Sequence, residues 1–119
     1  MSKKESFLAK AKRKTAKYVT NDGEEYLCQA MSERERAEYE LSCLDDEGTF
    51  EPEKMAGSRR MLIQFCLLDD DGKQMFSPAE RDQIGELDGQ FAGDLFAFLR
   101  KLCGLDAEAN DQLADTRKN

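Results

Sequence analysis

The apolar side chains of this chain are gathered in two segments, and this distribution constrains the fold more than any other feature. The most apolar run, residues 61–68, is eight residues long, which is too short to span a membrane as a helix. Alone, this run is compatible with a buried strand or a buried helix. Because residues 53–68 form one sixteen-residue segment after Pro52, too long for a typical strand, we predict that this segment is the central core helix.

The second apolar segment, residues 88–103, carries its apolar side chains at the spacing of a helix. Its stripe is wide enough to need cover on two sides, so two alternatives stay open: plain core of a monomer, or a face for association. We identify six of its residues as a possible self-association or client-binding face: Phe91, Leu95, Phe96, Phe98, Leu99 and Leu102. The glycines at 85, 89 and 93 favour a helix break near Asp88 over tight helix packing.

The N-terminal third of the chain predicts a hairpin followed by a helix. Residues 15–20 and 25–30 contain strand-forming side chains and flank a turn that ends in Gly23. A lone two-stranded ribbon is marginal in water, so it must lie on helices or pair with another chain. Ser32 precedes Glu35 at the capping-box spacing, and a helix over residues 33–44 should bury a narrow stripe of Ala37, Leu41 and Leu44.

The second half of the chain contains two further start signals for helices. Ser77, Pro78 and Glu80 give an N-cap, a proline at the first helical position and a capping glutamate. Gly104 is placed to end the helix over residues 88–103, and a weak final helix is expected over residues 107–116.

These elements predict a mainly α (α+β) fold, a small helical domain in which an N-terminal β-hairpin packs on about four to five helices. The length of 119 residues supports one domain. We divide the chain into a basic N-terminal arm (1–14), a single domain (15–105), and a C-terminal helix and tail (106–119).

Charge is distributed unevenly along the chain. Residues 1–20 hold seven basic side chains against one acid, a net charge of +6, so residues 21–119 carry −13 of the total of −7. An acidic body repels phosphate backbones, and we expect no nucleic-acid binding by it. The arm is interpreted either as a mobile soluble terminus or as a segment that contacts nucleic acid, a membrane surface or an acidic partner.

The absence of histidine removes most catalytic and metal chemistry. No histidine is present, so a Ser-His-Asp or Cys-His nucleophile and a Cys/His zinc site are impossible within the chain. An EF-hand frame starting at Asp69 fails because Lys73 occupies a ligand position. We therefore expect no enzyme activity, no metal and no cofactor. The four cysteines show no CxxC pair and follow no secretory signal, which favours free structural thiols in a reducing cytosol.

The run from Leu67 to Glu80 (LLDDDGKQMFSPAE), followed by an apolar helix that ends in Leu102-Cys-Gly-Leu105, resembles the tail assembly chaperone family of long-tailed bacteriophages. The shared pattern is a short hairpin, a Ser-x-x-Glu helix, an apolar helix before an Asp-x-x-Gly turn, and a final helix pair. It covers about residues 18–105, and the basic arm is not part of it.

The resemblance implies a non-enzymatic assembly factor made in the cytoplasm of the infected bacterial host. Such a protein coats the tape measure protein, keeps it soluble, and helps recruit the tail tube (major tail) protein through a frameshift-extended form. The resemblance also implies that the protein leaves before the tail is finished and is not expected in the mature virion. With the wide apolar stripe, it predicts a homo-oligomer that neither spans nor binds a membrane.

Two other functions stay open from the sequence. One is a small structural head-to-tail connector that remains in the virion. The other is an acidic regulatory adaptor or DNA mimic that occupies a basic surface on a host protein.

Overall fold

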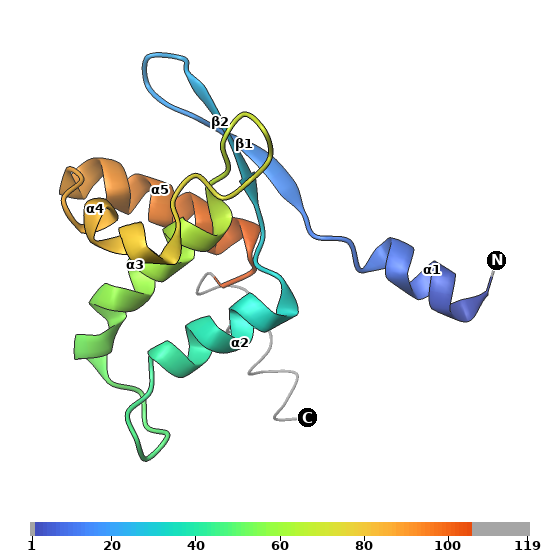
Figure 1. Cartoon of the computed structure of the whole chain (residues 1–119), viewed down its shortest axis with the longest axis horizontal. Coiled ribbons are helices and arrows are strands. Elements are labelled where there is room, and N and C mark those ends of the chain that lie inside the picture. The colour runs from blue at the N-terminus through green and yellow to red at the C-terminus, as the bar shows by residue number, and fades with distance from the viewer. Residues whose placement is uncertain (1, 106–119) are drawn as a thin grey trace.

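The computed structural model describes residues 2–105, which form a helical body, a β-hairpin against it, and an N-terminal helix that projects away from both (Figure 1). The predicted mainly α (α+β) class with an N-terminal hairpin is confirmed. The expected helix over residues 107–116 lies outside the described residues. In chain order the elements are α1 (Lys3–Lys10), β1 (Thr15–Val19), β2 (Glu25–Gln29), α2 (Glu33–Ser42), the 3-10 turn η1 (Pro52–Lys54), α3 (Met55–Cys66), the 3-10 turn η2 (Pro78–Glu80), α4 (Arg81–Gly85) and α5 (Gly89–Leu102).

The hairpin lies on the helical body. Strands β1 and β2 pair antiparallel with Tyr18 opposite Tyr26, and Gly23 has the positive φ of 87° that its turn requires. The Tyr18 ring packs on Phe98 of α5, with ring centroids 5.1 Å apart. The ribbon is therefore supported by a helix, as a two-stranded sheet of this size needs to be.

Helix α3 is the centre of the core, where Leu62 and Cys66 are fully buried, and it contacts α2, α4 and α5. The predicted helix over residues 53–68 is a 3-10 turn followed by α3, and it ends two residues early. Leu67 is extended, and the Leu68 N–H donates to the Leu27 carbonyl at 2.9 Å. Residues 67 and 68 pair with the free edge of β2, and this pairing provides the backbone hydrogen bonds that a further half-turn of helix would otherwise have provided.

Helix α2 buries a different face from the one predicted. Ala37 and Leu41 are exposed, Leu41 at 69%, whereas Tyr39 and Cys43 are buried. Both sets of residues have helical spacing, so periodicity did not distinguish them. The aromatic ring of Tyr39 removes more apolar area from water than Leu41 would, and it decides which face packs on α3.

The helix starts predicted at Ser77 and Asp88 and the helix end predicted at Gly104 are confirmed. The helical structure is interrupted between α4 and α5, and the Asp88 carboxylate caps α5 by accepting the Phe91 N–H at 3.0 Å. A capping box of Ser77 and Glu80 opens η2, which leads into α4. After α5, Gly104 adopts a φ of 72°, the left-handed conformation that ends many helices.

A chain of polar side chains runs through the body and joins segments distant in sequence. The Gln64 side chain, fully buried in α3, donates to Gln74 Oε1 at 2.7 Å and accepts from Arg81 Nη2 at 2.9 Å. Gln74 donates in turn to Glu35 at 3.0 Å, and Glu35 accepts from Arg13 at 2.8 Å. Among the described side chains, every buried nitrogen and oxygen has a hydrogen-bond partner. We call these five residues the polar chain.

The N-terminal arm, interpreted from the sequence either as a mobile soluble terminus or as a contact segment, contains a helix. Helix α1 contains no buried residue and leads away from the body (Figure 1). The last residues of the arm are fixed, because Arg13 Nε donates to the Ala30 carbonyl at 2.8 Å and the Ala30 N–H donates to the Lys14 carbonyl at 2.8 Å. The arm is thus a free helix on an anchored base.

Candidate functional site

The six apolar residues predicted as an association face are split by the fold. Leu95, Phe96 and Leu99 are buried in the core, and Phe98 and Leu102 are half-buried against it. Phe91, in the first turn of α5, keeps 44% of its surface exposed. A face made of all six residues remains a prediction. Phe91 is the exposed member of the six, so a partner can contact its side chain without unfolding the chain.

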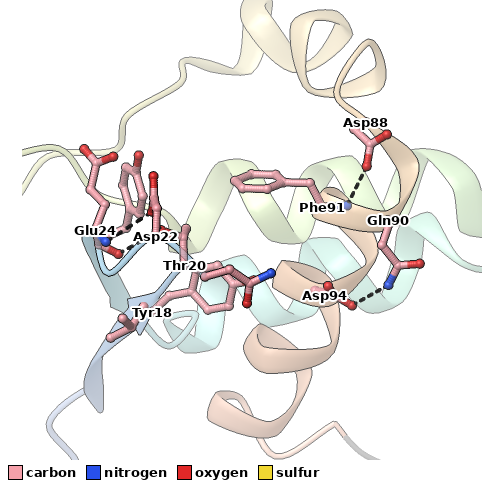
Figure 2. Close-up of a pocket in the computed structure, with 11 residues that line it drawn as sticks. Tyr18, Thr20, Asp22, Glu24, Asp88, Gln90, Phe91 and Asp94 are labelled. Atoms are coloured by element: carbon pink, nitrogen blue, oxygen red, sulfur yellow. Dashed lines mark hydrogen bonds between the residues drawn. The ribbon is translucent and has the colours of Figure 1, made fainter.

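Phe91 lies in an open groove of about 450 Å³ between the hairpin and the start of α5 (Figure 2). The groove has apolar side chains at its centre and acidic or amide side chains around it. Its lining residues are Tyr18, Val19, Thr20, Asn21, Asp22, Glu24, Tyr26, Asp88, Gln90, Phe91 and Asp94.

The two walls of the groove come from local signals that the sequence displays. On the hairpin side, the Thr20 hydroxyl donates to the Asp22 carboxylate, and the Glu24 N–H donates to the same oxygen at 3.3 Å. On the helix side, Asp88 caps α5, and Gln90 Nε2 donates to Asp94 Oδ1 at 2.9 Å (Figure 2). Asp22 and Asp88 are therefore held in place by the turn and the helix end that they stabilise, and Asp94 is held by Gln90 one turn earlier in α5.

The groove is strongly acidic. Among the residues that the structure describes, four carboxylates line it and no lysine or arginine does. The hydrogen bond from Thr20 and the backbone N–H of Glu24 lower the pKa of Asp22, so this carboxylate stays ionised at neutral pH. The Glu24 carboxylate accepts the Tyr26 hydroxyl and raises the pKa of Tyr26. At neutral pH the groove therefore combines four negative charges with a neutral phenol and an exposed phenyl ring.

This combination suits binding of a basic, amphipathic segment. An apolar side chain placed on Phe91 and Tyr18 leaves water, while lysines beside it meet carboxylates at the rim. In the part of the chain that the structure describes, no three histidine, cysteine, aspartate or glutamate side chains converge as metal ligands. The absence of enzyme activity, metal and cofactor stays a prediction.

Sequence reasoning named Phe91 and missed the acidic residues around it. The sequence indicated Asp22 only as part of the turn before Gly23 and Asp88 only as the place of a helix break, and it gave no role to Glu24 or Asp94. Two signals were available: the turn places Asp22 and Glu24 together, and Asp94 lies six residues after the cap at Asp88. Nothing in the sequence shows that the two walls face each other.

The cysteines form no disulfide among the described residues, where all four are free. Cys66 and Cys103 lie opposite each other with their sulfurs 3.8 Å apart. A hydrogen bond from Cys66 lowers the pKa of Cys103, and the same bond, together with burial, raises the pKa of Cys66. Burial also raises the pKa of Cys28 to about 11. The thiols therefore lie within or beside the core, away from the groove.

Among the described residues, no helix has the length and apolar character that crossing a membrane requires.

Comparison with known proteins gives one informative likeness. No protein-family model matches the sequence, and a search of curated proteins finds no significant match. The solved structure of the bacteriophage HK97 tail assembly chaperone superposes on this chain with a TM-score of 0.61 and 19% sequence identity. The superposition covers 85% of this chain and 98% of that chain. The chain therefore has the fold of a tail assembly chaperone, and the predicted resemblance is confirmed at that level.

Proposed function

We propose that this protein is a phage tail assembly chaperone that binds the tape measure protein, keeps it soluble and helps recruit tail tube subunits. The observation that carries the proposal is the shared fold, which extends over 98% of the chain of the HK97 tail assembly chaperone. The resemblance of residues 18–105 to the family, found from the sequence alone, points the same way.

The surface of the chain supports a role in binding apolar clients. The body is acidic, with −13 over residues 21–119, yet it exposes Phe50 and Phe91 in different parts of the fold. Strong net charge keeps a protein in solution, and exposed apolar side chains supply contacts for the apolar helices of a client. A chaperone requires both properties at once.

The proposal includes the setting in which the protein acts. It works in the cytoplasm of the infected bacterium, several copies associate along one tape measure chain, and a frameshift-extended form contacts the tail tube protein. The protein leaves before the tail is complete and is absent from the mature virion. It performs no catalysis and needs no cofactor.

Co-expression with the tape measure protein of the same phage tests the central claim. We expect this chain to move the tape measure protein from the insoluble pellet to the supernatant, and to co-purify with it. Expression of the tape measure protein alone, and with an unrelated acidic protein of similar size, provides the controls. An unchanged insoluble fraction would contradict the proposal.

Two further measurements separate the proposal from its alternatives. Mass spectrometry of purified virions should find no copy of this chain, whereas a head-to-tail connector would be present in every particle. Binding to the tape measure protein should largely persist as salt is raised, because its contacts are apolar. An acidic adaptor for a basic host protein would lose its binding steeply under the same change.

A further inference from the structure

Within residues 2–105, helix α1 has no surface to pack on. Phe7 is 70% exposed and Leu8 is 55% exposed, and none of the eight residues of α1 is buried. Isolated helices shorter than about 12–15 residues are marginal in water, and most helices in proteins are held by packing of an apolar face. An eight-residue helix with two large apolar side chains in water therefore points to a docking partner.

The chemistry of α1 defines what that partner must offer. Phe7, Leu8 and Ala11 share one side of the helix, following the i, i+3, i+4 rule for a common face. Lys3, Lys4, Lys10 and Lys12 surround this stripe, against the single acid Glu5. The matching surface is apolar at its centre, acidic at its rim and free of lysine and arginine.

The groove at Phe91 has this composition. Its centre offers the exposed Phe91 side chain beside the half-buried ring of Tyr18, and its rim carries Asp22, Glu24 and Asp94, with no basic side chain among the described residues that line it (Figure 2). A volume of about 450 Å³ accommodates large apolar side chains. This acidic groove and the basic helix α1 are thus complementary in both charge and apolar character.

The chain's own α1 does not reach this groove. Arg13 and Lys14 are fixed beside Ala30, at the open end of the hairpin. Phe7 lies at most about 13 Å from Arg13, from four helical and two extended steps. Thr20 lies about 20 Å from Lys14 along the strand, and α1 points away from the hairpin turn (Figure 1).

We propose that α1 of one copy of this protein docks in the groove of a second copy, with Phe7 and Leu8 against Phe91 and Tyr18 and the lysines at the acidic rim. The inference deepens the self-association included in the proposed function and rests on that function for its setting. The contact joins two different surfaces, so each copy offers one helix and one groove. Copies joined in this way form a chain or a ring, since a helix-to-groove contact is not symmetric.

Two variants that each destroy one side of the contact provide the test. Phe7→Glu with Leu8→Ser removes the apolar stripe and leaves the groove intact. Glu24→Lys with Asp94→Lys reverses two rim charges, leaving α1 and the cap at Asp88 intact. Leu41→Ser, which changes a leucine that is 69% exposed on α2, is the matched control. Circular dichroism on heating checks that each variant is folded.

Sedimentation velocity over a range of protein concentrations gives the readout. The wild type and Leu41→Ser should self-associate with the same constant, and the constant should fall as NaCl rises from about 0.05 to 0.5 M. The α1 variant should weaken association by about 10- to 100-fold for each apolar side chain that no longer packs. The groove variant should weaken it through charge repulsion.

Mixing the two variants is the decisive experiment. A solution of both contains one intact helix and one intact groove on different molecules, so a 1:1 heterodimer should form, and it should not grow further. Folded variants that associate like the wild type, a wild type that stays monomeric at all concentrations, or a mixture that stays monomeric would each overturn the inference. The solubility of the tape measure protein is measured separately, so failure of this contact is distinguishable from failure of the proposed function.

Discussion

Helices α1 and α2 begin with the same signal, a serine followed three residues later by a glutamate, but they relate differently to the rest of the molecule. Ser2 accepts the Glu5 N–H at 3.1 Å and Ser32 accepts the Glu35 N–H at 3.2 Å. Beyond that, α2 buries Tyr39, and Glu35 bonds to Arg13 and Gln74. Helix α1 buries nothing. The local signal forms a helix in both places, and only tertiary contacts tie its stability to that of the body.

The largest expected difference between the two helices comes from their aromatic residues. Tyr39→Ala should lower the free energy of unfolding of the body by about 3–5 kcal/mol, because it empties a large buried site. Phe7→Ala should leave that free energy unchanged within about 0.5 kcal/mol. Urea unfolding followed by far-UV circular dichroism measures both. A loss of several kcal/mol in Phe7→Ala would show that α1 is part of the body.

The glutamates of the two start signals should differ by a smaller amount. Glu35→Ala removes a cap and leaves Arg13 and Gln74 without their acceptor, so we expect a loss of about 1–3 kcal/mol in the free energy of unfolding. Glu5→Ala is the matched control and should not change it. Equal effects of the two substitutions on the urea midpoint would contradict the role given to Glu35 in the polar chain.

Substitution of the two serines measures the contribution of the N-cap hydrogen bond alone. Ser32→Ala should cost about 1 kcal/mol, the usual value for a lost N-cap. Ser2→Ala should reduce helix content slightly without shifting the unfolding midpoint of the body. Hydrogen exchange measured by mass spectrometry separates the two effects: Ser2→Ala should speed exchange only in residues 3–10, and faster exchange in the body as well would contradict the comparison.

The smallest effect concerns pH. The Ser77 backbone N–H lowers the pKa of Glu80 below its ordinary value of 4.5, so the folded state favours the ionised form. This contribution is present above pH 4.5 and is lost as pH falls through the lowered pKa. Glu80→Gln keeps an acceptor that does not titrate, and its urea midpoint should fall less between about pH 5.5 and 3.5 than that of the wild type. Glu5→Gln, in α1, should follow the wild type.

Features with a local cause were predictable from the sequence. The turn at Gly23, the capping boxes of Ser32 and Ser77, and the break at Asp88 each depend on a few neighbouring residues, and the structure confirms all of them. The signal at Ser2 is equally local, yet it was overlooked because the surrounding lysines suggested a solvated terminus.

Features with a tertiary cause were not predictable in the same way. Leu67 and Leu68 continue an apolar run that fits a helix, and the free edge of β2 draws them into an extended conformation. Leu41 and Tyr39 have equally good helical spacing, and the surface offered by α3 selects Tyr39. The groove forms because the hairpin turn faces the start of α5. Asp22 and Asp94 are far apart in the sequence, and no local pattern predicts that they line the same groove.

The polar chain has a consequence for recognising relatives of this protein. Gln64 interrupts the most apolar run of the sequence because Arg81 and Gln74 depend on its amide. A relative with leucine at this position would remove the side-chain acceptor of the half-buried Arg81 and one bond of the exposed Gln74. Substitutions at these three positions should therefore occur together in evolution. Where overall identity is as low as 19%, we expect co-variation of positions 64, 74 and 81 to identify relatives better than the identity of any single residue does.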